Sequence, residues 1–125
     1  MYKQLIIINM EEAEKKEGTD KILFFHGRTY MGIEGNRFTI AGTCYPNKID
    51  MGIAICSFSD QFVKSKGREL ALERLNKIYT KNGVMSFLLV VKTGNERQTF
   101  NRIASSLQLM TKQELVEIFN LHKEE

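Results

Sequence analysis

The segment from Ser57 to Ile78 constrains the fold more than any other part of the chain. Ser57 and Asp60 have the spacing of a capping box, in which side chains satisfy the backbone N–H groups at a helix start. At about 100° per residue, small and apolar residues then fall within one arc, with Leu75 at its edge: Val63, Gly67, Leu70, Ala71 and Ile78. We therefore predict a helix over residues 57–78 that covers a sheet, with Gly67 and Ala71 permitting close approach.

The basic residues of this helix allow two interpretations. Lys64 and Arg68 are four residues apart and therefore neighbours on the helix surface, and with Lys66 they precede the first following acid, Glu69. They form either a solvated basic face or a phosphate-binding face. Arg74 projects near the middle of the apolar arc, where a guanidinium needs a carboxylate, a carbonyl or a bound anion.

The bulk properties fit one domain of 125 residues with a net charge of +3, which permits anionic partners without demanding them. Cys44 and Cys56 lack the spacing of a zinc site. We expect free thiols in a reducing compartment, with a disulfide between adjacent strands as the alternative. No apolar run reaches the length of a membrane span, and the N-terminus has no signal-peptide pattern, so a cytoplasmic protein without membrane contact is expected.

The remaining pattern predicts an α+β fold with a mostly antiparallel, N-terminal sheet of about five strands, packed by the central helix and followed by two C-terminal helices. The expected strands are 2–10, 21–33, 37–45, 49–56 and a central strand over 84–91, with a charged loop over 11–20. Glu34-Gly35-Asn36 and Pro46-Asn47-Lys48 are expected turns, and Gly83 an expected helix C-cap. One late helix is expected from Glu96 to about Leu109. The other starts at a Thr111–Glu114 capping box, with Leu115, Ile118, Phe119 and His122 on its face.

Catalytic motifs are absent from the sequence. There is no Ser-His-Asp order, HExxH, P-loop or GxGxxG, and His26 and His122 stand apart from any acid–base partner. Glu11, Glu12 and Glu14 have the character of a solvated loop. We therefore expect a protein that is not an enzyme, with no catalytic residues, no metal and no cofactor.

Anion binding is better supported, at two strand-to-helix junctions, 56–60 and 91–96. The N-terminus of a helix directs backbone N–H groups at such a junction. Asn95 lies in the second junction, with Lys92, Arg97 and Arg102 around it and Phe100 on the same helix. Asp60 and Glu96 weaken either site, and ordinary capping by Ser59 and Asn95 is the alternative.

A third candidate is the hairpin, where Arg28 and Arg37 accompany Tyr30, Phe38 and Tyr45. Aromatic rings beside arginines can sandwich a nucleobase. The alternative is a half-buried sheet with a charged outer face. The full set of candidate ligand-binding residues is Arg28, Lys64, Arg68, Arg74, Asn95, Arg97, Phe100 and Arg102.

A family resemblance narrows the ligand. Residues 52–74 read as a strand ending in Cys56-Ser57, then Asp60-x-Phe62-x-Lys64-x-x-Gly67-Arg68-x-x-Ala71-x-x-Arg74. This pattern resembles the first family of Thoeris anti-defence proteins of phages. The resemblance implies a sponge that binds, without cleaving, the cyclic ADP-ribose signal of a bacterial TIR enzyme, blocking immunity in the infected cell. It carries over only Lys64, Arg68 and Arg74 as ligand contacts, since the rest of the chain does not match residue by residue.

The resemblance also implies partners: a small cyclic nucleotide, with cyclic oligonucleotides at separate sites in some members, and assembly of dimers into larger homo-oligomers. Two other classes stay open. A nucleic-acid-binding module would use Lys64, Lys66 and Arg68 against a phosphate backbone, although a charge of +3 is modest for that role. A protein-interaction domain or homodimer would use Leu72 and Tyr79 on the outer helix face.

Overall fold

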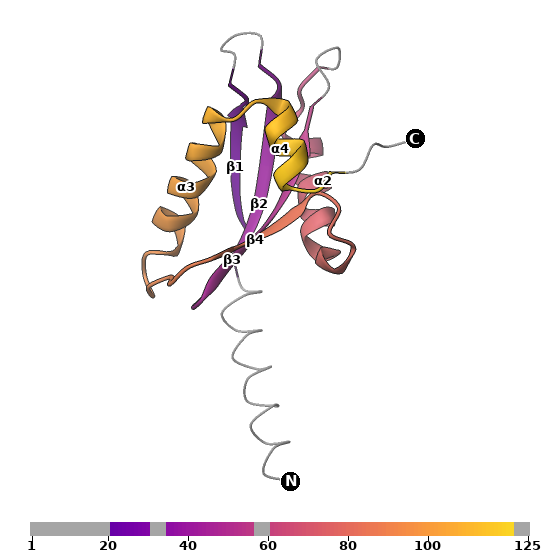
Figure 1. The fold of residues 1–125 in the computed structure, drawn as a ribbon. Coiled ribbons are helices and arrows are strands. Elements are labelled where there is room, and N and C mark those ends of the chain that lie inside the picture. The colour runs from indigo at the N-terminus through magenta and orange to yellow at the C-terminus, as the bar shows by residue number, and fades with distance from the viewer. Residues whose placement is uncertain (1–20, 31–34, 57–60, 122–125) are drawn as a thin grey trace.

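The computed structural model describes residues 21–30, 35–56 and 61–121. Within them the protein is an α+β fold with one four-stranded antiparallel sheet and three α-helices (Figure 1). Each strand pairs with its neighbour in the chain: β1 (Leu23–Arg28), β2 (Arg37–Tyr45), β3 (Lys48–Ile55) and β4 (Val84–Leu88). The helices are α2 (Lys64–Asn76), α3 (Glu96–Ser106) and α4 (Lys112–Ile118), with 3-10 turns η2 (Ile78–Thr80) and η3 (Leu107–Leu109).

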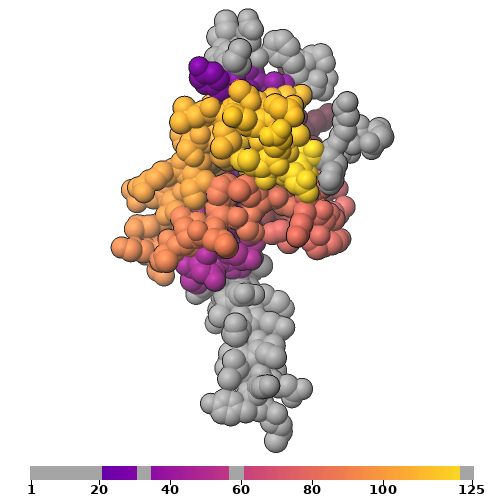
Figure 2. Space-filling model, in the orientation of Figure 1, coloured from indigo at the N-terminus to yellow at the C-terminus, as the bar shows by residue number. Residues whose placement is uncertain are grey.

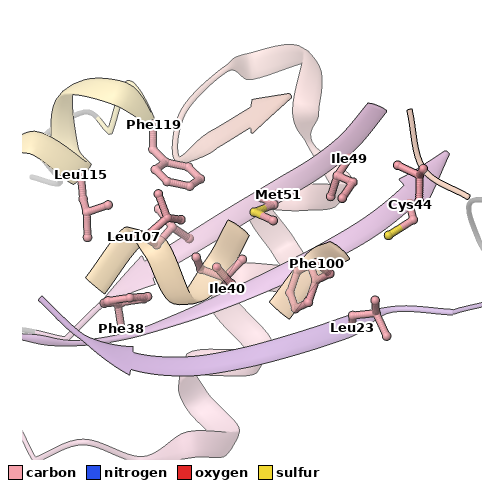
Figure 3. Packing of buried hydrophobic residues seen from close by; sticks show 13 residues of the cluster. Leu23, Phe38, Ile40, Cys44, Ile49, Met51, Phe100, Leu107, Leu115 and Phe119 are labelled. Atoms are coloured by element: carbon pink, nitrogen blue, oxygen red, sulfur yellow. The ribbon is translucent and has the colours of Figure 1, made fainter. Parts of the chain in front are cut away.

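One face of the sheet carries the large apolar core. Alternate residues of the strands point to this face, among them Phe38 and Ile40 of β2 and Met51 of β3. Phe100 of α3 and Phe119 after α4 complete the cluster, and none of these five side chains is exposed (Figure 3). Seen from this side, the orange and yellow segments of the C-terminal half cover most of the sheet (Figure 2). This face supplies most of the buried apolar surface and hence most of the stability.

The opposite face carries α2 and is built from small residues. Ala41 and Ala54 of the sheet meet Ala71 and Leu75 of the helix. A Cβ added to Gly52 would lie 2.5 Å from the Ala71 carbonyl oxygen, and one added to Gly67 would lie 2.4 Å from Thr39 Oγ1. The predicted close approach of the helix is confirmed, and it explains why glycine is tolerated in mid-helix at Gly67.

The predicted start of the central helix is wrong. The helix begins at Lys64 rather than near Ser57, and its N-cap is Val63, which offers no side-chain acceptor. Ser57, Ser59 and Asp60 lie outside the described residues. The first turn of α2 reads Lys64-Ser-Lys-Gly67 and has no acid. Its N-terminal N–H groups are therefore not countered by any carboxylate within that turn.

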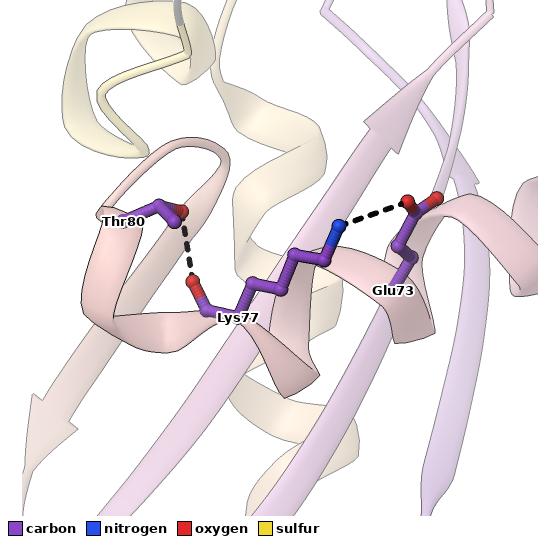
Figure 4. Close-up of polar contacts among 3 residues, drawn as sticks. All are labelled: Glu73, Lys77 and Thr80. Atoms are coloured by element: carbon purple, nitrogen blue, oxygen red, sulfur yellow. Dashed lines mark hydrogen bonds and ion pairs between the residues drawn. The ribbon is translucent and has the colours of Figure 1, made fainter.

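Polar contacts stabilise the C-terminal end of α2. Lys77 Nζ pairs with Glu73 Oε2 at 3.4 Å, and Thr80 Oγ1 donates to the Lys77 carbonyl oxygen at 2.8 Å (Figure 4). The C-cap of η2 is Lys81, in the left-handed region at φ 56°, rather than the predicted Gly83. Gly83 has φ 76° and donates its N–H to the Phe119 carbonyl oxygen. It therefore ties α4 to β4 rather than ending a helix.

Most of the predicted strands are confirmed, but the last one has a different place in the sheet from the one predicted. The β2 bounds agree with the prediction, the Pro46-Asn47 hairpin joins β2 to β3, and the Thr111–Glu114 capping box is present. The β1–β2 connection is longer than a tight Gly-Asn turn, because Arg28 pairs with Arg37. The strand predicted to be central, β4, lies at the end of the described sheet. The predicted strand 2–10 and loop 11–20 lie outside the described residues.

Cys44 and Cys56 are both thiols, as expected. Cys44 is buried at the end of β2, and its Sγ contacts the Glu96 carbonyl oxygen at 3.7 Å. Burial, reinforced by the Glu96 carboxylate, raises the Cys44 pKa to about 11. The thiol is therefore protonated at neutral pH and is a packing residue rather than a nucleophile.

Candidate functional site

The candidate site is centred on His26, on the α2 face of the sheet. His26 lies in β1 directly opposite Thr39 of β2, and its Nδ1 is 2.8 Å from Thr39 Oγ1. The Phe62 ring meets the His26 ring edge-on, with centroids 5.8 Å apart. The Arg37 guanidinium stacks on Phe62 at 4.3 Å from its centroid. Three side chains from separate segments thus form a compact cationic and aromatic cluster.

The first half of α2 adds positive charge to this cluster. The pKa of His26 is lowered from 6.5, first by burial and then by the positive charges of Lys64, Arg68 and Arg37. Such an effect on one imidazole indicates that these three groups lie near it, although Lys64 and Arg68 are far from His26 in sequence. We call His26, Arg37, Phe62, Lys64 and Arg68 the basic cluster.

The strands bring two arginines side by side at the edge of the basic cluster. Arg28 of β1 is directly opposite Arg37 of β2. Like charges opposite each other on neighbouring strands are destabilising unless something compensates them. Arg28 donates from Nη1 to the Gly35 carbonyl oxygen at 3.1 Å. Among the described residues, the side-chain ion pairs are Lys48–Asp50 and Glu73–Lys77, and neither involves the basic cluster.

A hollow of about 520 Å³ opens beside the basic cluster. Phe62 belongs to both, and Lys66 and Gly67 of α2 form one wall, with the end of β3 opposite. Small-molecule sites range from about 300 to 1,000 Å³, so this volume suits one nucleotide-sized ligand. The hollow thus combines an aromatic ring, a lysine and a helical first turn that itself contains no acid.

The other end of the α2 face differs in charge. A hollow of about 460 Å³ there is lined by Tyr45, Asp50 and Leu72, among others. Asp50 is buried, accepts a hydrogen bond from Ser86 Oγ and pairs with Lys48 Nζ at 3.5 Å. A carboxylate in the wall disfavours an anionic ligand. The charge distribution therefore selects the end of the face that holds the basic cluster.

The predicted residues divide between the two faces. Lys64, Arg68 and Arg28 lie on the side of the basic cluster. Arg74 donates from Nη1 to the Ile53 carbonyl oxygen at 2.7 Å and lines a separate hollow with Glu73 and Lys77. Its position in the apolar arc is explained by this bond, one of the three alternatives that the sequence left open.

The second predicted anion site, on α3, belongs to the opposite face. Phe100 has no exposed surface and packs in the core, so this part of the prediction is corrected: the buried ring offers nothing to a ligand. Arg97 and Arg102 are exposed on α3, away from the basic cluster. Asn95 is the N-cap residue without a side-chain cap, and Glu96 Oε1 accepts the Gly94 N–H at 2.9 Å. A carboxylate therefore takes the position that an anion would need.

Sequence reasoning missed His26 and Phe62. The available signal was the strand alternation, which places His26 on the same face as Arg28. Its use required the hairpin register, because only the Arg28–Arg37 pairing sets His26 opposite Thr39. Phe62 gave no comparable signal, since it was interpreted as part of the helix start.

In comparisons with known proteins, the chain matches no family model, no curated protein and no solved structure. In the part of the chain that the structure describes, no three His, Cys, Asp or Glu side chains are grouped as a metal site. None of the helices in the same part has the length and apolar character needed to cross a bilayer. Function therefore has to be inferred from the basic cluster and the hollow.

Proposed function

We propose that this protein binds a small, phosphate-bearing nucleotide at the basic cluster and holds it without chemical change. The observation that carries the proposal is the stacking of Arg37 on Phe62 beside His26, where Gly67 packs the basic first turns of α2 against Thr39. Charges of one sign that gather from β2 and α2 repel each other unless an anion offsets them. A bound phosphate provides that offset and gains charge-assisted hydrogen bonds from guanidinium groups.

The shape and chemistry of the hollow favour a small nucleotide over a nucleic acid chain. A hollow of about 520 Å³ with Phe62 in its wall suits one base and its phosphates. A nucleic acid duplex is usually bound by an extended basic surface, whereas the net charge here is only +3. Combined with the resemblance of residues 52–74 to the first Thoeris anti-defence family, this favours a cyclic ADP-ribose isomer as the ligand.

Binding without cleavage follows from the types of residue involved. Guanidinium and ammonium groups stay protonated at neutral pH and supply charge rather than proton transfer. His26 is the exception: burial and the neighbouring cations lower its pKa from 6.5, and its Nδ1 is engaged by Thr39 Oγ1 at 2.8 Å. A protein with this site would act as a phage sponge in the infected bacterial cell: by sequestering the cyclic nucleotide signal, it would block Thoeris-type immunity.

A thermal-shift screen tests this function. The panel contains cyclic ADP-ribose isomers, cyclic di- and trinucleotides, NAD, and short RNA and DNA duplexes, at low and moderate salt. A ligand at about a thousand times its Kd adds about 4 kcal/mol to the free energy of unfolding. The midpoint of a domain of this size then rises by roughly ten degrees or more. The matched variants are Lys64→Glu, inside the basic cluster, and Lys112→Glu, at the start of α4.

The proposal expects a large shift with one cyclic nucleotide, recovered intact after the protein is heated. That shift should collapse in Lys64→Glu and persist in Lys112→Glu. Recovery of altered ligand would indicate an enzyme instead. Shifts confined to duplexes, growing with their length and fading with salt, would indicate nucleic-acid binding. Equal shifts in both variants would place the ligand away from the basic cluster.

A further inference from the structure

The described sheet has two edges, and the described residues of the chain cover only one of them. At the β1 end, the Arg28 N–H donates to Gln108 Oε1 at 3.2 Å and the Tyr30 N–H donates to the Met110 carbonyl oxygen at 2.7 Å. The C-terminal half thus covers part of that edge. Within residues 21–30, 35–56 and 61–121, no comparable bond covers the last part of β4, where Leu88 is 83% exposed and, just beyond the strand, Val90 is 78% exposed.

The backbone of β4 presents unused hydrogen-bonding groups at this end. The bonds that extend the β3–β4 pairing use the Gly83 carbonyl oxygen and the N–H groups of Leu89 and Val91. All three residues have odd numbers. Because hydrogen-bonding direction alternates along an antiparallel strand, the even-numbered residues direct their N–H and C=O groups to the free side. Among the described residues, Ser86, Leu88 and, just beyond the strand, Val90 therefore form an open edge, of which Ser86 also lines the groove that η2 and Asn120 make beside Val84.

The chemistry of this open edge is unusual for a protein surface. Edge strands are normally blunted by charges, proline or a bulge that prevents pairing with another chain. From Gly83 to Val91 the sequence GVMSFLLVV contains no charge and no proline. Two large apolar side chains stand exposed there: Leu88 at the end of β4 and Val90 two residues beyond it. A segment of this kind is expected to be covered by another strand.

We infer that the open edge of β4 pairs with β4 of a second copy of this chain. A two-fold axis at Leu88 would place this residue opposite its counterpart and Ser86 opposite Val90 of the other copy. In such an isologous interface, a residue on the two-fold axis contacts the same residue of the other copy. A charged residue there would therefore be repelled by an identical charge. The uncharged edge satisfies that condition. The result is an antiparallel dimer with one continuous sheet of eight described strands.

This interface differs from the one predicted from the sequence. Leu72 is half-buried and packs against the small-residue cluster under α2, and Tyr79 is exposed on η2. The β4 edge offers both backbone groups and apolar side chains, whereas Tyr79 offers one ring. The dimer does not depend on nucleotide binding, because the basic cluster involves β1, β2 and α2 rather than β4.

Sedimentation equilibrium of the full chain, from micromolar to hundreds of micromolar, tests the inference. We expect a concentration-dependent dimer. Leu88→Lys should weaken it by at least about tenfold, because two lysines meet near the axis. Leu109→Lys is the matched control, since Leu109 is 76% exposed on η3, and it should leave the mass unchanged. Val90→Pro removes an outward N–H and should also weaken the dimer while the β3–β4 pairing is kept.

Circular dichroism and thermal unfolding establish that each variant is folded. A wild-type protein that stays monomeric over the whole range would overturn the inference, since its edge is then left open or is covered by its own chain. Equal effects of Leu88→Lys and Leu109→Lys would also overturn it. A dimer lost in Leu88→Lys but unaffected in Val90→Pro would show packing through side chains without strand pairing, contrary to the inference.

Discussion

The two faces of the sheet are built from different residues and have different capacities. The face under α3 and α4 is filled with phenylalanine, isoleucine and leucine and excludes water. The face under α2 has alanine and glycine where the helix touches, and Thr39, His26 and Asp50 elsewhere. The first face supplies hydrophobic stabilisation, and the second leaves polar and charged groups near hollows. Stability and binding are thus assigned to opposite sides of one sheet.

This division has a physical cause. The small residues under α2 bring the helix backbone close to the sheet. The larger side chains of α2 therefore lie beside this contact rather than between the helix and the sheet. The first half of the helix then places Lys64 and Arg68 over the end of β1 and β2, where His26 and Arg37 lie. A thick apolar layer, as on the other face, would hold such cations away from the strands. Close packing at Gly67 is therefore part of how the basic cluster is assembled.

The largest expected effect comes from the apolar face. Phe100→Ala should lower the free energy of unfolding by about 3–5 kcal/mol, because it removes a fully buried ring and leaves a cavity. Leu70→Ala on α2 should cost less than about 1 kcal/mol, since Leu70 is 38% exposed beside the hollow. Urea unfolding measures both. Similar losses in the two variants would show that the faces do not divide as described.

The next effect separates two arginines of the same helix. Arg74→Ala should lower the free energy of unfolding by about 1.5–3 kcal/mol, the usual contribution of a hydrogen bond to a charged group, because the Ile53 carbonyl oxygen loses its donor. Arg68→Ala should change it by no more than about 0.5 kcal/mol. The same denaturant titrations measure both values. A stable Arg74→Ala variant with weakened nucleotide binding would return Arg74 to the ligand contacts that the family resemblance implies.

The smallest effect is a dependence on pH through His26. Burial first, and then Lys64, Arg68 and Arg37, hold the His26 pKa below 6.5, so the unfolded chain binds the proton more readily. The stability that His26 contributes is therefore full above its unfolded pKa and is lost as pH falls toward its folded pKa. A phosphate at the basic cluster would offset the cations and raise the His26 pKa, so nucleotide binding should tighten as pH falls.

Denaturant unfolding of wild type and His26→Asn at roughly pH 5 and 8 measures the pH dependence of stability. Calorimetric titrations with the nucleotide at the same two pH values measure the pH dependence of binding. The variant should lose less stability between pH 8 and pH 5 than wild type does. If nucleotide affinity in the wild type is the same at both pH values, ligand binding does not change the His26 pKa, contrary to the prediction.

The fold was largely predictable because its signals are local. The alternation in β2, the Pro46-Asn47 turn and the Thr111–Glu114 box each specify structure within a few residues, and all three are found. The place of β4 was not predictable in this way. An apolar run of eight residues is typical of a buried central strand, and nothing in it shows that Leu88 is exposed at the end of the sheet.

The candidate site was only half predictable for a related reason. Lys64 and Arg68 were found because helical spacing makes them neighbours. The distinction between Arg68 and Arg74 depends on the Ile53 carbonyl oxygen of β3, which is 21 residues from Arg74 and leaves no trace in the helical spacing. His26 and Phe62 join the basic cluster only through the register of the hairpin and the approach of α2. Such long-range geometry is outside what spacing alone can predict.

The most direct test of nucleotide binding at the basic cluster is calorimetric titration with a cyclic ADP-ribose isomer. It compares wild type with Arg68→Ala, in the basic cluster, and Arg102→Ala, an exposed arginine of α3 on the other face. We predict that Arg68→Ala weakens binding about tenfold or more, as expected for loss of one charge-assisted contact, while Arg102→Ala stays within about twofold of wild type. Loss of binding in Arg102→Ala with normal binding in Arg68→Ala would contradict the assignment of binding to the α2 face.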